Sequence, residues 1–200
     1  FRDVKKNKNI FLFCISYFFY IDCVNTVIKM AVSLATEMGI TDTMSLVVVI
    51  FINIIACPFS ILFGKLVGNF GSKKMIYAGI IGYIGVVGCG AMIQSNPSFI
   101  WLVALLVGMF QGGIPSVSRS YFAKLIPDKA DSNEFFGFFS VFSKFSAILG
   151  PIAVSIIIMI TGETRYGILG LIPMMVLGMI FLMFVKDPES EQKFRKKKKV

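Results

Sequence analysis

The run MSLVVVIFINIIACPFSILF, residues 44–63, contains no charged side chain. A helix needs about 20 mostly apolar residues to cross the hydrocarbon layer of a bilayer, and this run supplies them. Backbone groups in lipid must be satisfied within each segment, which forces such runs into helices. The chain therefore predicts an all-α membrane protein with six transmembrane helices, at about 10–32, 44–63, 75–93, 99–117, 135–160 and 166–185.

The composition agrees with a bilayer as the solvent. The mean hydropathy is +0.80, 56% of the residues are hydrophobic and only 16% are charged, whereas a soluble domain needs more polar surface to cover its core. The 4 Cys all lie in apolar runs and there is no His, so a zinc site, a haem, a His-based triad and a disulfide framework are unsupported. We expect no metal, no cofactor and no enzymatic activity.

The basic residues gather on one side of the predicted spans. Seventeen of the 20 Lys and Arg lie before the first span, in the second and fourth joints, and after the last span, whereas Lys29 and Lys144 lie inside spans. Such an excess of Lys and Arg marks the cytoplasmic side of a membrane protein. Membrane topology therefore explains the positive charge, and we expect no nucleic acid as a partner. We expect a multi-pass protein of the cell membrane, with a basic cytoplasmic segment at 1–9, a six-helix bundle at 10–185 and a basic cytoplasmic tail at 186–200.

Polar side chains inside the spans are candidates for binding a substrate or an ion. Asp22, Asn25 and Lys29 fall on one face of a helix, at spacings of three and four. A charge at the bilayer centre costs at least ~2.5–3.5 kcal/mol, so Asp22 should face a cavity or a partner; a structural ion pair, bridged by Asn25, is the alternative. Gln111 in the fourth span and Lys144 in the fifth, which we expect to face the bundle interior, complete the candidates.

Glycine and proline mark places where spans bend or approach closely. Glycine permits close helix contact and proline frees a backbone carbonyl, so these residues predict either a kink beside a binding site or a simple packing contact. The positions are Gly112, Gly113 and Pro115 in the fourth span and Gly150 and Pro151 in the fifth. Arg119, at the cytoplasmic end of the fourth span, is expected to be an anchor or gate residue.

The second joint, FGKLVGNFGSKKM at residues 63–75, resembles the loop signature of the major facilitator superfamily. That signature reads Gly, three residues, acid, base, any, Gly, any, base, base. Four residues match in register, and Gly68 stands where the family has its acid. The matching residues are Gly64, Gly71, Lys73 and Lys74.

Two longer stretches, FFYIDCVNTVIKMAV at 18–32 and the segment 112–151, resemble the vacuole-effluxer-like branch, related to autophagy-associated vacuolar amino-acid effluxers. The resemblance implies twelve helices in two halves, with this chain as the carboxy-terminal half and the amino-terminal six-helix half of the same chain as its partner. It also implies a secondary transporter that moves a small polar solute, such as an amino acid, by alternating access. Coupling to a proton or sodium ion would run through Asp22. A six-helix channel or a membrane scaffold without transport activity is the alternative.

Overall fold

The structure, a computed structural model, describes residues 7–37, 41–91, 99–126 and 132–187, and all regular elements within them are helices. This confirms the predicted all-α class. The basic residues at 1–6 and the tail from 188 onward lie outside the described residues. The helices are α2 (Lys8–Glu37), α3 (Asp42–Phe70), α4 (Ser72–Ala91), α5 (Phe99–Leu125), α6 (Ser132–Ser146), α7 (Leu149–Thr161), α8 (Thr164–Leu169) and α9 (Leu171–Phe184).

Five stretches of the described residues are long and apolar enough to cross a membrane. Two of these stretches combine a pair of consecutive helices, α6 with α7 and α8 with α9. The helix α4 has 20 residues but is not one of the five, so the count of six spans stays a prediction. The five stretches are Lys8–Met30, Thr43–Phe70, Trp101–Leu125, Ser132–Thr161 and Thr164–Phe184.

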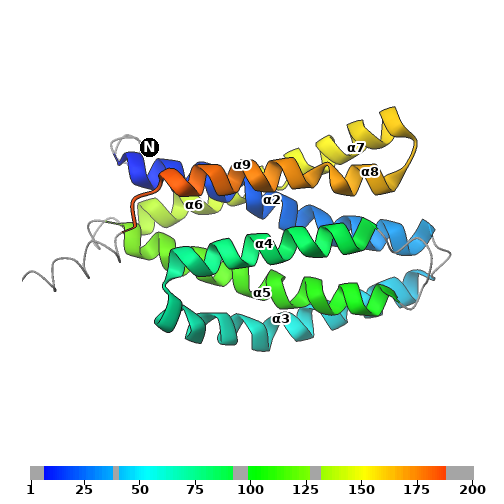
Figure 1. The fold of residues 1–200 in the computed structure, drawn as a ribbon, viewed down its shortest axis with the longest axis horizontal. Coiled ribbons are helices and arrows are strands. Elements are labelled where there is room, and N and C mark those ends of the chain that lie inside the picture. Colours follow the sequence, from blue (N-terminus) through cyan, green and yellow to red (C-terminus); the bar gives the residue numbers. More distant parts are fainter. Residues whose placement is uncertain (1–6, 38–40, 92–98, 127–131, 188–200) are drawn as a thin grey trace, which may run out of the picture.

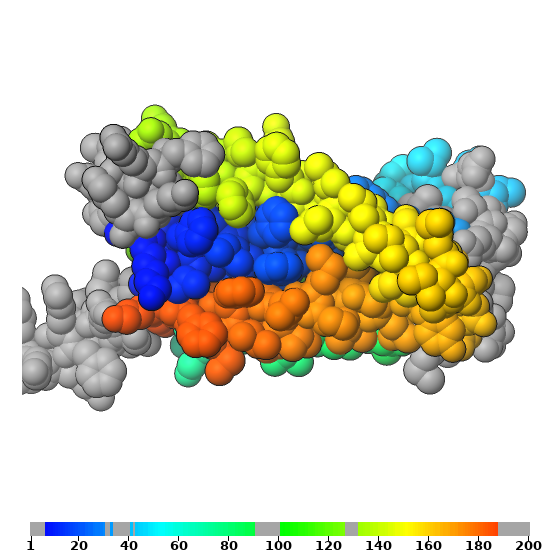
Figure 2. Space-filling view, turned by 90° about the horizontal axis from the view of Figure 1, so that it is seen from above, coloured from blue at the N-terminus to red at the C-terminus, as the bar shows by residue number. Residues whose placement is uncertain are grey.

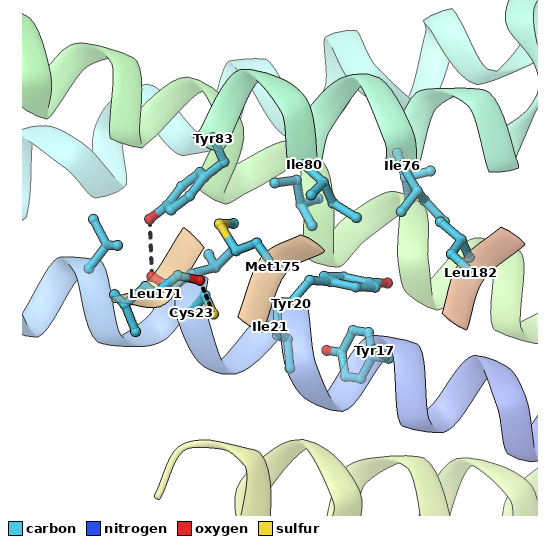
Figure 3. Close-up of a cluster of buried hydrophobic side chains, with 14 of the residues drawn as sticks. Tyr17, Tyr20, Ile21, Cys23, Ile76, Ile80, Tyr83, Leu171, Met175 and Leu182 are labelled. Atoms are coloured by element: carbon cyan, nitrogen blue, oxygen red, sulfur yellow. Dashed lines mark hydrogen bonds between the residues drawn. The ribbon is translucent and has the colours of Figure 1, made fainter. Parts of the chain in front are cut away.

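The helices run along one common direction, with α2 in the middle of the bundle (Figure 1). Seen from above, α2 lies between the α6–α7 pair on one side and α9 on the other (Figure 2). Its remaining sides pack on α4 and α5, and Figure 3 shows side chains of α2, α4 and α9 meeting in one cluster. The helix that holds most of the predicted polar candidates is therefore enclosed by its neighbours.

The start of α2, the turn between α3 and α4, and the end of α9 meet at one end of the bundle (Figure 1). Asn9 donates to the backbone oxygen of Lys186 at 3.3 Å and accepts from its N–H at 3.0 Å. The Lys124 ammonium, at the end of α5, donates to the Ser72 hydroxyl at 2.9 Å. The described segments that contain most of the Lys and Arg residues therefore lie at the same end of the bundle. This agrees with the collection of Lys and Arg in alternate joints of the sequence.

Glycines let α5 lie directly on α3. A side-chain carbon added at Gly112 would stand 2.9 Å from the Ala56 Cα, with the backbone oxygen of that residue closer still. One added at Gly113 would fall on the ring of Phe63. The helix α5 continues through Pro115 from Phe99 to Leu125. The expected weakening does not break this span, and the glycines are explained by close packing.

The fifth predicted span, 135–160, is not one helix. The helix α6 ends at Ser146, a turn at Ala147–Ile148 follows, and α7 begins at Leu149. The last predicted span is likewise divided, at Gly170, into α8 and α9. Hydropathy cannot distinguish one long helix from two short ones, because it registers only side-chain polarity. The first of these breaks lies beside the candidate site.

Candidate functional site

The polar side chains of α2 connect it to its neighbours. The Tyr20 hydroxyl shares a 2.7 Å hydrogen bond with the Ser118 hydroxyl of α5, and both groups are buried. The Tyr83 hydroxyl of α4 donates to the Val24 carbonyl at 3.1 Å, as Figure 3 shows. Ser16 donates to a backbone carbonyl of α9 at 2.7 Å. These three hydrogen bonds thus hold α2 against α5, α4 and α9.

Asp22 is the exception. Its side chain is fully buried, and neither carboxylate oxygen has a hydrogen-bond partner. The residue lies against the start of α7, where a side-chain carbon added at Gly150 would stand 2.9 Å from Asp22 Oδ1. Thr26, one helical turn further along α2, is also fully buried and touches the same glycine, and its hydroxyl has no hydrogen-bond partner either. Asp22 and Thr26 therefore form a buried polar pair facing a helix start.

The break between α6 and α7 gives this pair its electrostatic setting. The first N–H groups of a helix have no partner within the helix and carry partial positive charge, which favours a nearby carboxylate. Gly150 lies in the first turn of α7, and its missing side chain lets Asp22 approach the backbone. Pro151 fits the same first turn because it needs no N–H donor there. Sequence reasoning missed Thr26, although its position four residues after Asp22 placed it on the same helix face.

The row formed by Asp22, Asn25 and Lys29 does not act as one network. Because both Asp22 oxygens lack partners, neither Asn25 nor Lys29 donates a hydrogen bond to that carboxylate. Asn25 is half-buried and Lys29 is exposed. The bridged ion pair considered from the sequence is therefore wrong. The physical reason is that the seven residues between Asp22 and Lys29 span about 10 Å of helix axis.

Gln111 lies half-buried on α5, and its Oε1 is buried without a hydrogen-bond partner. It does not donate to Asp22, whose oxygens accept no hydrogen bond. Asp22 on α2 and Gln111 on α5 thus have buried oxygens without hydrogen-bond partners and are not bonded to each other. Among the described residues there is no group of three or more His, Cys, Asp or Glu that could hold a metal ion.

Lys144 is exposed on α6, so it does not lie in the interior of the described helices, and its expected place on the binding pathway stays a prediction. The buried residues of this helix are Phe135, Phe139 and Ser146. Since α6 ends at Ser146, Lys144 lies in its last turn, where the helix carbonyls favour a cation. The early end of the helix accounts for a lysine that seemed to lie deep inside a long span.

The loop motif contributes a contact between helices. Gly71 ends α3 with a φ of 89°, a backbone conformation that favours glycine. The Lys73 ammonium donates to the backbone oxygens of Val185, at 2.6 Å, and Met183, at 3.3 Å. Partial burial lowers the pKa of Lys73, and the nearby Asp187 carboxylate opposes that change. Lys73 thus satisfies carbonyls at the end of α9 that the helix itself leaves unpaired.

The other motif positions make no such contact. A side-chain carbon added at Gly64 or Gly68 would meet no atom within 4 Å among the described residues. Lys74 is exposed. The glycine that replaces the family's acid at position 68 therefore has open space around it in this chain, and Lys73 and Ser72 tie the turn to α9 and α5.

Comparisons with known proteins agree with the resemblance. The model of the family described as "Vacuole effluxer Atg22 like" matches residues 1–194. The uncharacterized MFS-type transporter YxiO of Bacillus subtilis is 40% identical over 94% of this chain, which covers 44% of that protein. Autophagy-related protein 22 of Vanderwaltozyma polyspora is 30% identical over 88% of this chain, which covers 36% of that protein. The chain spans less than half the length of these relatives, and it belongs to the vacuole effluxer Atg22-like family of membrane transporters.

Proposed function

We propose that this chain is the carboxy-terminal half of a secondary transporter that moves a small polar solute by alternating access. The observation that carries the proposal is Asp22, a fully buried carboxylate in a candidate membrane span that has no hydrogen-bond partner. An unpaired charge there is costly, so such residues generally serve transport pathways or relays. The family supports the same reading, since its description names an effluxer.

The Asp22 carboxylate supports coupling to a cation. An ionised carboxylate in an apolar interior requires a partner, and none of the described residues supplies a hydrogen bond. A proton or a sodium ion would remove that cost. The Thr26 hydroxyl and the first turn of α7 lie beside the carboxylate and would hold its oxygens in place. Amino acids remain the proposed substrate class, from the family resemblance.

The missing partner is proposed to be an amino-terminal six-helix half. The chain covers 44% of the bacterial relative's length, which leaves room for a second bundle of similar size. In this proposal α4 crosses the membrane as the third of six spans, and Asp22 and Gln111 belong to a pathway completed by the other half. A six-helix channel or scaffold is the alternative, and no observation on the described residues favours it.

Transport can be tested with the full-length protein in proteoliposomes loaded with a panel of amino acids. We expect saturable counterflow, in which an internal pool accelerates uptake of labelled solute. Asp22→Asn keeps the shape and removes the charge, so transport should fall about tenfold or more, as expected for a lost charged hydrogen bond. Glu134→Gln is the matched control, since Glu134 is an exposed acid on α6. A non-saturable flux without counterflow would indicate a channel, and parental transport by the Asp22 variant would remove Asp22 from the mechanism.

Membrane orientation needs its own test, because the charge pattern alone supports cytoplasmic termini. Asn69, near the end of α3, and Glu163, between α7 and α8, are exposed, and these two helix ends lie at opposite ends of the bundle (Figure 1). A cysteine at Asn69 should react with an impermeant maleimide only from the cytoplasmic side, and one at Glu163 only from outside. The opposite pattern would reverse the orientation.

A further inference from the structure

The contact between Asp22 and the start of α7 leaves no room for another atom. A side-chain carbon added at Gly150 would overlap the Thr26 hydroxyl and would stand 2.9 Å from Asp22 Oδ1. The side chains of Asp22 and Thr26 are fully buried. The two polar side chains therefore fill the space between α2 and α7 at this point.

Few groups at this contact could bind a metal cation. The oxygens there that lack hydrogen-bond partners are the two carboxylate oxygens of Asp22 and the hydroxyl of Thr26. A hard cation takes about six oxygen ligands, and each of them needs a place around the ion. At the end of α6, the carbonyls of Ser143 and Phe145 already accept hydrogen bonds from groups in the following turn. The contact thus has neither the ligands nor the volume for a sodium ion.

The helix end beside Asp22 also has the wrong polarity for a metal cation. The N-terminus of a helix carries partial positive charge. In the broken helices of transporters, such ends point at anionic groups, whereas carbonyls and the C-terminal ends of helices coordinate Na⁺. Gly150 lies in the first turn of α7, so Asp22 lies against an N-terminal end. That end repels a metal cation and stabilises an ionised carboxylate.

A proton meets neither obstacle. It binds to one carboxylate oxygen, needs no shell of ligands, adds almost no volume and removes the charge that burial makes costly. When the proton leaves, the first turn of α7 favours the carboxylate. The Thr26 hydroxyl can then rotate its hydrogen toward the charged oxygen. The contact can therefore hold Asp22 in both protonation states.

The titratable groups on the surrounding helices do not neutralise Asp22. The helices α7 and α9 contain none, and α3 and α4 carry charged residues only near their ends. Cys23 and Tyr83 donate to backbone carbonyls, and Tyr20 shares its hydrogen bond with Ser118. None of the described residues donates a hydrogen bond to the Asp22 carboxylate. The charged side chains nearer the middle of the chain's other covering helices are Arg119 on α5, Lys144 on α6 and Arg165 on α8, and α2 itself carries Lys29; of these, Lys29, Arg119 and Lys144 are exposed.

We propose that Asp22, Thr26 and the first turn of α7 form a proton-binding site that does not take sodium. While α2 and α7 are in contact, the Asp22 carboxyl holds its proton and is neutral. Release transfers the proton to water, which must enter between α2 and the start of α7, beside the break at Ala147–Ile148. The inference rests on the proposed function in taking Asp22 as the coupling group, and it identifies the coupled cation as a proton.

Protonation of Asp22 can be measured without transport. A carboxylic acid and a carboxylate absorb at different infrared frequencies, so the full-length protein in detergent is titrated with pH and followed by infrared difference spectroscopy. We expect a carboxylic acid band that persists at a pH where exposed acids are ionised and that is absent from Asp22→Asn. Glu134→Gln, which changes an exposed acid on α6, is the matched control and should keep the band. Replacing choline chloride with sodium chloride should leave the titration midpoint unchanged.

Thr26 carries the test if Asp22→Asn does not fold. Thr26→Val keeps the shape of the side chain and removes a donor from the ionised carboxylate. Hydrogen bonds to charged groups are stronger than those to neutral groups, so the titration midpoint should rise by about one pH unit. Thr26→Ser keeps the hydroxyl and should titrate close to the parent.

Three results would overturn the proton site: no carboxylic acid band depends on Asp22, sodium lowers the titration midpoint, or the two Thr26 variants titrate alike. The second result would indicate that sodium competes with the proton, and it would leave the proposed transport intact. An Asp22-dependent band that sodium does not affect, in a protein without counterflow, would instead overturn the proposed transport and leave the proton site intact.

Discussion

The contact between α3 and α5 predicts a large cost for a single added methyl group. At Gly112 that methyl would meet the Ala56 backbone, with the Cα only 2.9 Å away, and a backbone cannot rotate aside as a side chain can. Overpacking of this kind costs about 1–3 kcal/mol, and a backbone obstacle favours the upper end of that range. Gly112→Ala should therefore force the two helices apart and lower the free energy of unfolding.

A matched control separates this cost from helix propensity. Alanine is favoured over glycine within a helix by about 1 kcal/mol, which would partly hide the effect of Gly112→Ala. Gly85 lies within α4, and a side-chain carbon added there meets no atom within 4 Å among the described residues. Gly85→Ala therefore gains the higher helix propensity of alanine without a steric clash. The difference between the two variants isolates the steric term, about 3 kcal/mol.

The measurement is unfolding of the full-length protein in mixed micelles as the fraction of denaturing detergent increases, followed by circular dichroism. A second readout is Trp101, the one tryptophan in the chain, which meets Phe51 across the α3–α5 contact at 5.4 Å between ring centroids. With other tryptophans of the full-length protein replaced, its emission should change in Gly112→Ala and not in Gly85→Ala. Equal free energies of unfolding for the two variants would refute the packing argument.

Three further predictions concern individual contacts. Tyr20→Phe removes the bond to Ser118, whose hydroxyl keeps its bond to the Ile114 carbonyl, so the unfolding free energy should fall by about 1 kcal/mol in the same titration; no change would contradict the Tyr20–Ser118 bond. Lys73→Met should destabilise the protein by about 1 kcal/mol, whereas Lys74→Met, at an exposed position, should not; equal effects would remove the contact with α9. N-ethylmaleimide should modify the exposed thiols before the buried ones, as mass spectrometry of digests can show, and the reverse order would contradict the burial. The exposed thiols are Cys57 and Cys89, and the buried ones are Cys14 and Cys23.

The helical class could be predicted from the sequence because uncharged runs such as 44–63 admit no other structure in lipid. The shared end of the bundle was also predictable, since Lys and Arg collect in alternate joints. The break at Ala147–Ile148 was not predicted. Both residues are apolar, and the adjacent Gly150 and Pro151 are equally compatible with close packing of an unbroken helix. Only the packing of α2 against α7 shows that this break lies beside a buried carboxylate.

The sequence identified Asp22, the central residue of the candidate site, but not the groups that lie beside it. Periodicity placed Asp22 on one face with Asn25 and Lys29, but it could not say which helix covers that face. The covering helix is α7, so the group beside Asp22 is a helix start and not a lysine. The depth of Lys144 was counted through a helix that ends at Ser146, so this residue lies in a last turn and not midway along a helix. Sequence periodicity identifies neither the covering helix nor the helix end.

The distribution of polarity among the helices follows from the bilayer. The helix α3 has no charge over 44–63 and exposes large apolar side chains such as Leu46, Ile50 and Ile54. The helix α2 carries tyrosines and an acid, and Ser16, Asp22 and Thr26 on this helix are fully buried. In water this arrangement would be inverted, whereas in lipid the cost of exposing a polar group to hydrocarbon draws it between helices. Tyr20 and Ser16 use that burial for hydrogen bonds that hold the bundle together. Asp22 is buried just as fully and forms none of these bonds, which is why we propose that its carboxylate serves transport and not the packing of the helices.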